Sequence, residues 1–434
     1  MGQGIIDQLI AGTFPDPDGG PPLRVETRAV AIRRSLSNIE ADLVRPLSLG
    51  RRLAVVSDRN THAILGARIE RALRSLGEVV SIVLPERPHA DSATAERVRK
   101  AAASADALVA VGSGTINDLC KYASARDSKR YVVFGTAPSM NGYTSLSAAI
   151  TVDGHKKSLP AQAPDGVFFD LSILAAAPLR MIRSGLGDSL CRPTAQADWL
   201  LSHLLFARPY RSMPFVLLAE DEGRLLSSAS ALMRGDLDAM ECLLRTLLLS
   251  GFGTAICGSS LPASQGEHLI SHYLDMTLGD QRPITFHGEQ IGVTTLTMAR
   301  LQNRVLDGEA PIIAGDRNTE ADFIARFGPV IGPSCWREYS EKRVTAELVD
   351  ALNHRIATSW EEIRAAIGAI ATPAGKLEDV LREAGAQRSP EELHWPRPTY
   401  QDAARHAREI RNRYTFLDLA ADGRLLDQMI PLIA

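Results

Sequence analysis

The sequence predicts an α/β fold in its first part and an all-helical fold in its second part. Up to about residue 178, short apolar runs of strand length alternate with amphipathic segments of helix length. Such alternation is typical of a mostly parallel sheet with helices on both of its faces. From about residue 180 onward, long stretches have helical spacing, and almost nothing alternates like a strand.

The first part contains five expected strands, three expected helices (one of them beginning near Thr115) and an expected hairpin. The strands fall at 52–58, 79–85, 107–114 (ending in a glycine turn), 131–136 and 166–171. Helices are expected at 64–77 and at 92–105, and the second one opens on Ser92 as a capping residue. The hairpin at 146–161 is expected to turn at Asp153 and Gly154.

Near Pro178 the alternation of strand and helix patterns gives way to helical patterns alone, and this change divides the chain into two expected domains. Residues 1–24 form an N-terminal extension, 25–178 the sheet domain and 179–434 the helical domain. Long helical patterns occupy 236–256 and 399–420. The segment 306–345 is less regular and richer in glycine and proline, which indicates an insertion in the helical domain.

The composition excludes several classes of protein. The net charge is −3 and arginines are interleaved with acidic residues, so the sequence shows no basic patch of the kind that binds nucleic acid. Five scattered cysteines without a Cys-x-x-Cys pair suggest free thiols in a reducing compartment. The N-terminus does not resemble a signal peptide, and Arg245 interrupts the longest apolar stretch, 243–257. We therefore expect a cytoplasmic protein without a membrane span.

A glycine turn follows the expected strand at 107–112. Gly112 and Gly114 stand with one residue between them, and a helix begins near Thr115. Such glycines let backbone N–H groups approach a pyrophosphate, and a helix N-terminus favours negative charge. Asn117 occupies the third position of the usual glycine fingerprint, and Asp118 can either cap the helix or bind a cofactor hydroxyl. A purely structural glycine turn is the alternative.

The loop 135–145, "GTAPSMNGYTS", follows the next strand. Thr136, Ser139 and Ser145 offer hydroxyl groups, and Asn141 stands in the middle. A Ser/Thr-rich turn that satisfies its own backbone is the alternative. Because parallel strands end at one edge of a sheet, we expect this loop and the glycine turn to border one crevice. Asp58, after the first strand, suggests a further contact with a cofactor ribose.

Three histidines and one aspartate of the second part form a candidate metal site. Asp188 follows a glycine-containing turn, His268 and His272 are four residues apart on one helix face, and His287 precedes Gly288. Histidine and aspartate together can hold Zn²⁺ or Fe²⁺ with an open coordination position, as a catalytic metal needs. Each of these histidines taken singly is more often a core or surface residue.

Five motifs in order resemble the glycerol-1-phosphate dehydrogenases, and most closely their bacterial arabinose-operon M-type branch. They are "GSGTINDLCKY", "TAPSMNGYTS", "GLGDSL…TAQADW", "GSSLPASQGEHLISH" and "HGEQIGVTTL". This family belongs to the superfamily of iron-containing alcohol dehydrogenases and 3-dehydroquinate synthases. The resemblance implies a Rossmann-like N-terminal domain, an all-helical C-terminal domain (the dehydroquinate synthase-like fold), a metal, a nicotinamide cofactor and a homodimer.

The resemblance also implies roles for particular residues. Gly112 and the run Gly114, Thr115, Ile116, Asn117 and Asp118 would bind the cofactor, NAD or NADP, and Thr136, Ser139 and Ser145 its nicotinamide half. Asp188, His268 and His287 would bind the metal, zinc or in some members nickel or iron. His272 and Asn141 would face the substrate. Apart from the resemblance, basic residues around the cleft, such as Lys156, Lys157 or Arg192, are candidates for holding the substrate phosphate.

The implied reaction is the metal-assisted reduction of dihydroxyacetone phosphate to sn-glycerol 1-phosphate. Two departures lie in the expected substrate pocket: the family usually has Asp at Asn141, and a Gly-Lys-aromatic sequence at Cys191-Arg192-Pro193. A related polyol or ketone substrate is therefore also open. The alternatives are a cyclase like 3-dehydroquinate synthase, and a non-catalytic nucleotide-binding homologue.

Overall fold

The computed structural model describes residues 4–152 and 155–434, and its internal contacts divide the chain into two compact units. The first unit comprises Met1–Ser189 with Ser212–Ser259, and the second comprises Leu190–Arg211 with Ser260–Ala434. The sequence expectation of a boundary near Pro178 differs from this division. The helices between residues 212 and 259 belong with the first unit because the long helix α13 (Leu237–Cys257) packs against α7 (Leu171–Ala175) and against the short helix η3 (Gly142–Thr144).

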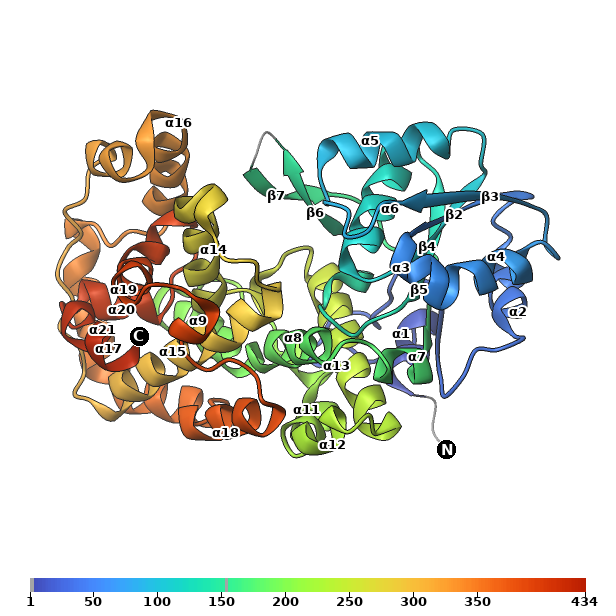
Figure 1. Ribbon diagram of the computed structural model, residues 1–434. Helices are drawn as coiled ribbons and strands as arrows, with labels where there is room; N and C mark the ends of the chain where they lie inside the picture. The colour runs from blue at the N-terminus through green and yellow to red at the C-terminus, as the bar shows by residue number, and fades with distance from the viewer. Residues whose placement is uncertain (1–3, 153–154) are drawn as a thin grey trace. The chain divides into compact units, whose positions relative to one another are not determined.

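A six-stranded, wholly parallel sheet forms the centre of the first unit, in the order β1-β8-β5-β4-β2-β3. Figure 1 labels β2, β3, β4 and β5 of this sheet. Its strands are β1 (Ala29–Arg33), β2 (Arg52–Asp58), β3 (Glu78–Leu84), β4 (Ala107–Gly112), β5 (Arg130–Gly135) and β8 (Gly166–Asp170). The five strands expected from apolar runs are all present. The sequence reading missed β1, an edge strand of five residues in which only Ala31 is buried.

Helices cover both faces of this sheet, as the alternating pattern predicts. Leu53 and Val55 of β2 point toward α2 (Glu40–Val44) and α4 (Ala67–Leu73), and these residues share one apolar cluster. The opposite face carries α6 (Gly114–Arg126), against which α5 (Ser92–Ala101) packs. Shorter elements complete this part of the unit: α1 (Ile5–Ala11), η1 (Arg45–Leu47), α3 (Arg59–Thr61) and η2 (His62–Gly66).

Two of these helices differ in detail from expectation. The helix expected at 64–77 starts with a π-helical turn, η2, and ends at Leu73. The helix expected at 92–105 ends at Ala101, and its cap is Asp91 instead of Ser92. The Asp91 carboxylate accepts the Thr94 N–H at 2.7 Å. Asp91 stands one residue before Ser92, and from that position its side chain caps the first turn of the helix.

The expected hairpin is present as β6 (Ser147–Val152) and β7 (His155–Pro160), which pair antiparallel. Its predicted turn, Asp153 and Gly154, lies outside the described residues. The hairpin packs against α6 through β6. A short helix, η3 (Gly142–Thr144), stands between β5 and this hairpin.

The sheet order places the ends of β2 and β4 beside each other at a topological switch point. The chain runs from β2 to β3 on one side and then returns to β4 on the other side of β2. Ligands of open α/β sheets bind at such points, beyond the carboxyl ends of the strands. The loops after Asp58, Gly112 and Gly135 all leave this edge, because the strands are parallel and Gly112 pairs with Gly135.

Helices complete the first unit: α7 (Leu171–Ala175), α8 (Leu179–Leu190), α10 (Met213–Val216), α11 (Ala219–Leu226), α12 (Ala229–Met233) and α13 (Leu237–Cys257). Within the described residues, α13 is the one helix long and apolar enough to cross a membrane by length and composition. The structure buries 61% of its most apolar window. Within the unit it packs against α7, α10, α11 and α12, which is the environment of a core helix.

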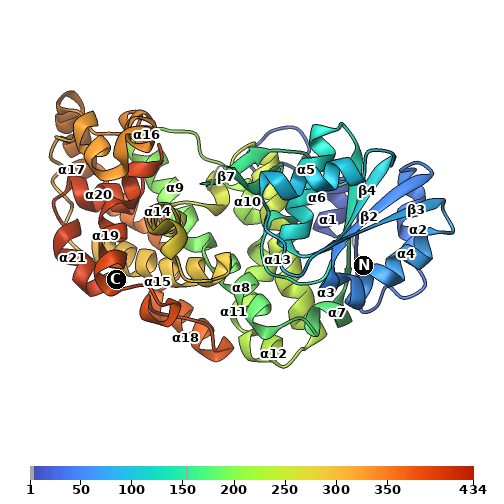
Figure 2. The same cartoon turned by 45° about the horizontal axis from the view of Figure 1, so that its top comes forward.

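Among the described residues, the second unit contains helices joined by loops and no strand, as expected. Figure 2 shows α14 (Gly266–Leu278) and α15 (His287–Asp307) next to each other, and they pack together. The other helices are α9 (Arg192–Phe206), η4 (Leu261–Ala263), η5 (Gly279–Gln281), α16 (Glu320–Ser340), α17 (Ala346–Gly368), α18 (Ala374–Ala384), η6 (Glu391–Leu393), α19 (Arg397–His406), η7 (Ala407–Ile410), α20 (Phe416–Asp422) and α21 (Leu426–Ile433).

Two segments of this unit differ from the sequence reading. About half of the segment 306–345 is regular, because α16 occupies it despite two internal prolines. A kink at Gly328, where φ is 77°, accommodates Pro329 at the start of a new helical turn. The pattern at 399–420 contains two α-helices and a 3₁₀ turn, with a break around Arg411 that is extended in conformation.

Candidate active-site residues

The glycine turn after β4 contains Gly112, which packing requires to be glycine, and Gly114, which has more space around it. A Cβ on Gly112 would lie 2.6 Å from Cβ of Ile116, so the turn from strand to helix needs glycine there. A Cβ on Gly114 would meet the flexible Met140 side chain at 3.3 Å. In the part of the chain that the structure describes, no side chain caps α6, and Ser113, the residue before the helix, is extended. The first-turn N–H groups of α6 therefore suit an anionic ligand.

The residues that follow in α6 point in different directions. Ile116 is buried in the core and Thr115 is partly exposed. Asn117 is completely buried, and within the described residues neither polar atom of its side chain has a hydrogen-bond partner. Asp118 Oδ2 accepts the Ala149 N–H at 3.2 Å, which ties the helix to β6. This contact of Asp118 with the hairpin is one that spacing does not reveal.

Asp58, at the end of β2, acts as a helix cap. Its carboxylate accepts the Thr61 N–H at 2.8 Å, and Thr61 Oγ1 accepts the Asp58 N–H at 3.0 Å. This reciprocal pair is a capping box that starts α3. The carboxylate is half-buried at the edge where the sheet order reverses.

The loop 135–145 is linked to the glycine turn and to α6. The Thr136 N–H donates to Gly112 O at 3.1 Å, so the two loops begin side by side. Thr136 and Ser139 are almost completely buried. Ser145 Oγ lies 3.1 Å from Gly142 O and 3.0 Å from Ser147 O, and so contributes to the loop's internal bonding.

A buried lysine, which the sequence reading did not single out, anchors the same loop. Lys121 Nζ donates to Gly142 O at 2.5 Å, to Ser145 Oγ at 3.0 Å and to Ser147 O at 3.1 Å. Burial lowers the pKa of Lys121 to about 8, and the nearby Asp118 opposes this shift. The sequence signal that could have identified Lys121 is its position one helical turn after Asp118 in "GSGTINDLCKY".

Two helices of the first unit approach the loop through glycines. A Cβ on Gly185 of α8 would lie 1.7 Å from Pro138 O, and a Cβ on Gly251 of α13 would lie 2.1 Å from Thr144 Oγ1. The absence of a side chain at both positions is therefore what lets these helices contact the loop. Ser184 Oγ and Thr144 Oγ1 add hydrogen bonds to Ser139 O and Leu248 O, at 3.1 and 3.0 Å.

These contacts bring Asn141 and Asp188 together within the first unit. The Asn141 backbone N–H donates to Asp188 Oδ2 at 2.9 Å. The Asn141 side chain donates from Nδ2 to Ser250 Oγ over a longer distance of 3.4 Å. Asp188 is only 2% exposed, so its carboxylate is held in a fixed position near the end of α8.

The three candidate histidines lie together within the second unit. His268 and His272 are one turn apart on α14, and His287 is the first residue of α15. The ring centroid of His268 is 5.1 Å from that of His287 and 6.0 Å from that of His272, and the third separation is 6.2 Å. Gln290 fixes the two helices, because its amide accepts from Ser271 Oγ at 2.7 Å and donates to Thr285 Oγ1 at 2.9 Å.

Glu267 is a functional candidate that the sequence reading missed. It is fully buried, and its Oε1 lies 2.9 Å from His268 Nδ1. Cys191 lies near the same pair: one ligand atom each from Cys191, Glu267 and His268 lie within 4.8 Å of one another. An acidic residue directly before a candidate metal ligand was the signal in the sequence.

The three basic residues considered for a substrate phosphate differ in their surroundings. Arg192 is half-buried at the first position of α9 and donates to Gln196 Oε1 at 3.1 Å. Burial lowers its pKa to about 10. Lys157 is exposed, and the side chain of Lys156 lies outside the described residues.

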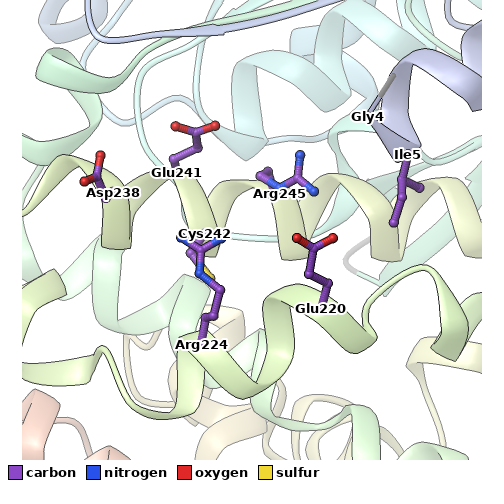
Figure 3. A pocket seen from close by; sticks show the side chains of 8 residues that line it. All are labelled: Gly4, Ile5, Glu220, Arg224, Asp238, Glu241, Cys242 and Arg245. Atoms are coloured by element: carbon purple, nitrogen blue, oxygen red, sulfur yellow. The ribbon is translucent and has the colours of Figure 1, made fainter. Parts of the chain in front are cut away.

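A cavity of about 460 Å³ in the first unit lies away from the predicted site residues. Figure 3 shows it between α13, which carries Glu241 and Arg245, and α11, which carries Glu220 and Arg224. Arg245 is paired with the buried Asp221 at 2.9 Å, and acidic and basic groups alternate around the cavity. None of the predicted site residues lines it.

Comparisons with known proteins support the sequence reading. A family model described as iron-containing alcohol dehydrogenase matches residues 31–178. The glycerol-1-phosphate dehydrogenase (NAD(P)+) of Bacillus subtilis (strain 168) is 26% identical over 416 residues, which cover 94% of both chains. The enzyme of the same name from Pyrococcus furiosus is 32% identical over 279 residues, 63% of this chain and 78% of the relative.

Solved structures confirm the expected fold class. A probable glycerol dehydrogenase from Sinorhizobium meliloti 1021 superposes with a TM-score of 0.60 at 19% identity, covering 94% of this chain and 98% of that one. Maleylacetate reductase from Rhizobium sp. strain MTP-10005 gives a TM-score of 0.60 at 18% identity, covering 92% and 95%. At such low identity the likeness bears on the fold alone.

Proposed function

Because this chain belongs to the glycerol-1-phosphate dehydrogenase family of the iron-containing alcohol dehydrogenases, we propose that it reduces dihydroxyacetone phosphate, or a related ketone, with NADH or NADPH. The product would be sn-glycerol 1-phosphate or the corresponding alcohol. Relatives that bear this activity in their names match most of the chain's length. The observation in this chain that best supports the proposal is the close grouping of the imidazoles of His268, His272 and His287 in the second unit.

Asp188, His268 and His287 are the proposed metal ligands. The donor set fits a divalent metal, because imidazole nitrogen and carboxylate oxygen suit zinc, nickel and iron. Within the second unit the imidazoles are close enough to share an ion after small side-chain rotations, and Glu267 contacts the far nitrogen of His268. Within the first unit the Asn141 N–H orients the Asp188 carboxylate. Zinc is the metal we propose.

The remaining residues would bind and orient the cofactor and the substrate. A metal in this site supplies a Lewis acid for the substrate carbonyl, and the nicotinamide supplies hydride. The first-turn N–H groups of α6 would bind the cofactor diphosphate. His272 would donate the proton that the product oxygen needs, and Asn141 would bind a substrate hydroxyl. Arg192, a half-buried cation at the start of α9, would hold the substrate phosphate.

The same family membership leads us to propose a cytoplasmic homodimer. A small-molecule ketone as substrate requires neither nucleic acid nor a membrane surface. Size determination in solution at several protein concentrations tests the assembly, and a monomer at all concentrations would contradict it. NAD and NADP remain equal candidates, since Asp58 serves as a helix cap in the described structure.

Purified protein tests the proposal through its metal content and its turnover of nicotinamide. We expect one equivalent of divalent metal and steady NADH or NADPH oxidation with dihydroxyacetone phosphate. His268→Ala and His287→Ala should lose both metal and activity. His354→Ala, at an exposed position of α17, is the matched control and should keep both.

Three results would contradict the proposal. Full activity in the metal-free double histidine variant would exclude the metal mechanism. A product formed without net change in nicotinamide would identify a cyclase, and tight nucleotide binding without turnover of any ketone tested would identify a non-catalytic homologue. The screen should therefore include dihydroxyacetone and other polyol-derived ketones.

A further inference from the structure

We propose that Glu267 is a positioning residue that fixes the orientation and the tautomer of His268 for metal binding. The inference rests on the proposed function, because it takes His268 as a ligand of the metal. Glu267 occupies the first turn of α14, directly before His268. Its side chain is fully buried, and His268 is 5% exposed.

The carboxylate of Glu267 is bound on both of its oxygens. Oε1 accepts the Gln265 N–H at 2.8 Å and lies 2.9 Å from His268 Nδ1. Oε2 lies 3.4 Å from Thr194 Oγ1 of α9. A carboxylate only accepts hydrogen bonds, so the proton of a neutral His268 ring belongs on Nδ1. Nε2 then keeps its lone pair for a metal, and the carboxylate increases its donor strength.

The surroundings keep Glu267 in this position. Asp198 of α9 accepts the Gly266 N–H at 3.0 Å through Oδ2, which attaches the start of α14 to α9. Gln302 of α15 donates to Thr194 O at 3.0 Å and to Asp198 Oδ1 at 3.2 Å. Three helices therefore hold one carboxylate against one imidazole. Such a network is costly to bury unless the groups are satisfied, and here they are bonded to one another.

A different role for Glu267 is as a metal ligand itself, together with Cys191 and His268. Their ligand atoms lie within 4.8 Å of one another, so proximity alone permits it. The hydrogen bonds favour the positioning role. Oε1 of Glu267 already accepts two hydrogen bonds, and Cys191 Sγ donates to Ala263 O at 3.8 Å. An ion bound there would have to displace these contacts.

Metal affinity, measured by competition with a chelator, tests the proposal without any substrate. Glu267→Gln keeps an acceptor oxygen and the side-chain volume, and we expect it to weaken metal binding about tenfold. Glu267→Ala removes the acceptor, and we expect a loss of about a hundredfold. The melting temperature of the metal-free variants shows whether they are folded, and the Gln variant keeps the test valid if the Ala variant is not.

Glu70→Gln is the matched control. Glu70 is also buried and also contacts an imidazole, with Oε1 3.2 Å from His62 Nε2 in the first unit. We expect its metal affinity to equal that of the wild type. Equal weakening in Glu70→Gln and Glu267→Gln would overturn the proposal, because the effect would then be a general loss of stability. Unchanged affinity in Glu267→Ala would also overturn it.

Absorption spectra of the cobalt-substituted protein separate the two roles of Glu267. If Glu267 positions His268, the wild type should lack a sulfur-to-cobalt charge-transfer band, and Glu267→Gln should shift the ligand-field bands. A sulfur band that disappears in Cys191→Ala would place the metal among Cys191, Glu267 and His268, and would overturn the positioning role. Absence of any metal binding that depends on His268 would overturn the proposed function and this inference together.

Discussion

The backbone N–H of Asn141 donates to Asp188 Oδ2 at 2.9 Å. This bond joins Asn141, where the family resemblance leads us to expect Asp, to a proposed metal ligand. Because the donor is a backbone group, the side chain at position 141 is not needed for the contact. The side chain of Asn141 is therefore available to set substrate preference, apart from its long hydrogen bond to Ser250.

Asn141→Asp tests whether the side chain at position 141 sets substrate preference while its backbone holds Asp188. We expect the fold and the metal content to be unchanged, because the backbone bond to Asp188 remains. The added carboxylate can accept two substrate hydroxyls, and kcat/KM for dihydroxyacetone phosphate should rise about tenfold, or about 1.4 kcal/mol. Steady-state kinetics with several ketones measure the effect. Asn141→Ala is the control, and equal rates for all three proteins would contradict a role in specificity.

Metal removal should destabilise the protein. An ion that binds only the folded state adds about 2.7 kcal/mol to the free energy of unfolding at a free concentration of 100 times Kd. Dialysis against a chelator should lower the melting temperature of the wild type, and added zinc should restore it. His268→Ala should respond to neither treatment, and a zinc response in that variant would show that the ion binds elsewhere.

Lys121→Met tests the buried anchor of the loop 135–145. The folded state holds the pKa of Lys121 near 8, below its ordinary 10.5, so between these values the unfolded chain binds more protons. The free energy of unfolding of the wild type should therefore rise with pH across this window, relative to Lys121→Met. Urea denaturation at pH 7 to 10.5 measures the difference, and parallel curves would contradict it.

Gly185→Ala tests the approach of α8 to the loop. The new methyl group would lie 1.7 Å from Pro138 O, so helix or loop must move, and we expect a loss of about 3 kcal/mol in stability. Activity should fall as well, because α8 carries Asp188. Gly223→Ala is the matched control: apart from its chain neighbours and its own helix backbone, no atom of the described residues lies within 4 Å of its added Cβ in α11, and we expect a gain of about 0.5–1 kcal/mol. Equal effects of the two changes would exclude the packing argument.

The sequence by itself determined the α/β and all-helical parts, five strands of the sheet and the candidate residues. Local patterns carry this information, because an apolar run, a glycine turn or a pair of histidines one turn apart is defined by neighbours in the chain. Spacing therefore predicted that His268 and His272 share a helix face, and both lie on α14. The resemblance added the family, which the relatives confirm.

Only the tertiary structure decided which groups meet across the chain. No local pattern shows that Asn141 contacts Asp188, that Lys121 holds Ser145, or that Gly185 is needed beside Pro138. Such contacts depend on how the chain returns to itself, and their partners are separated by tens of residues. The edge strand β1 was missed for a related reason: its position is stabilised by pairing with β8, far along the chain, more than by its own five residues.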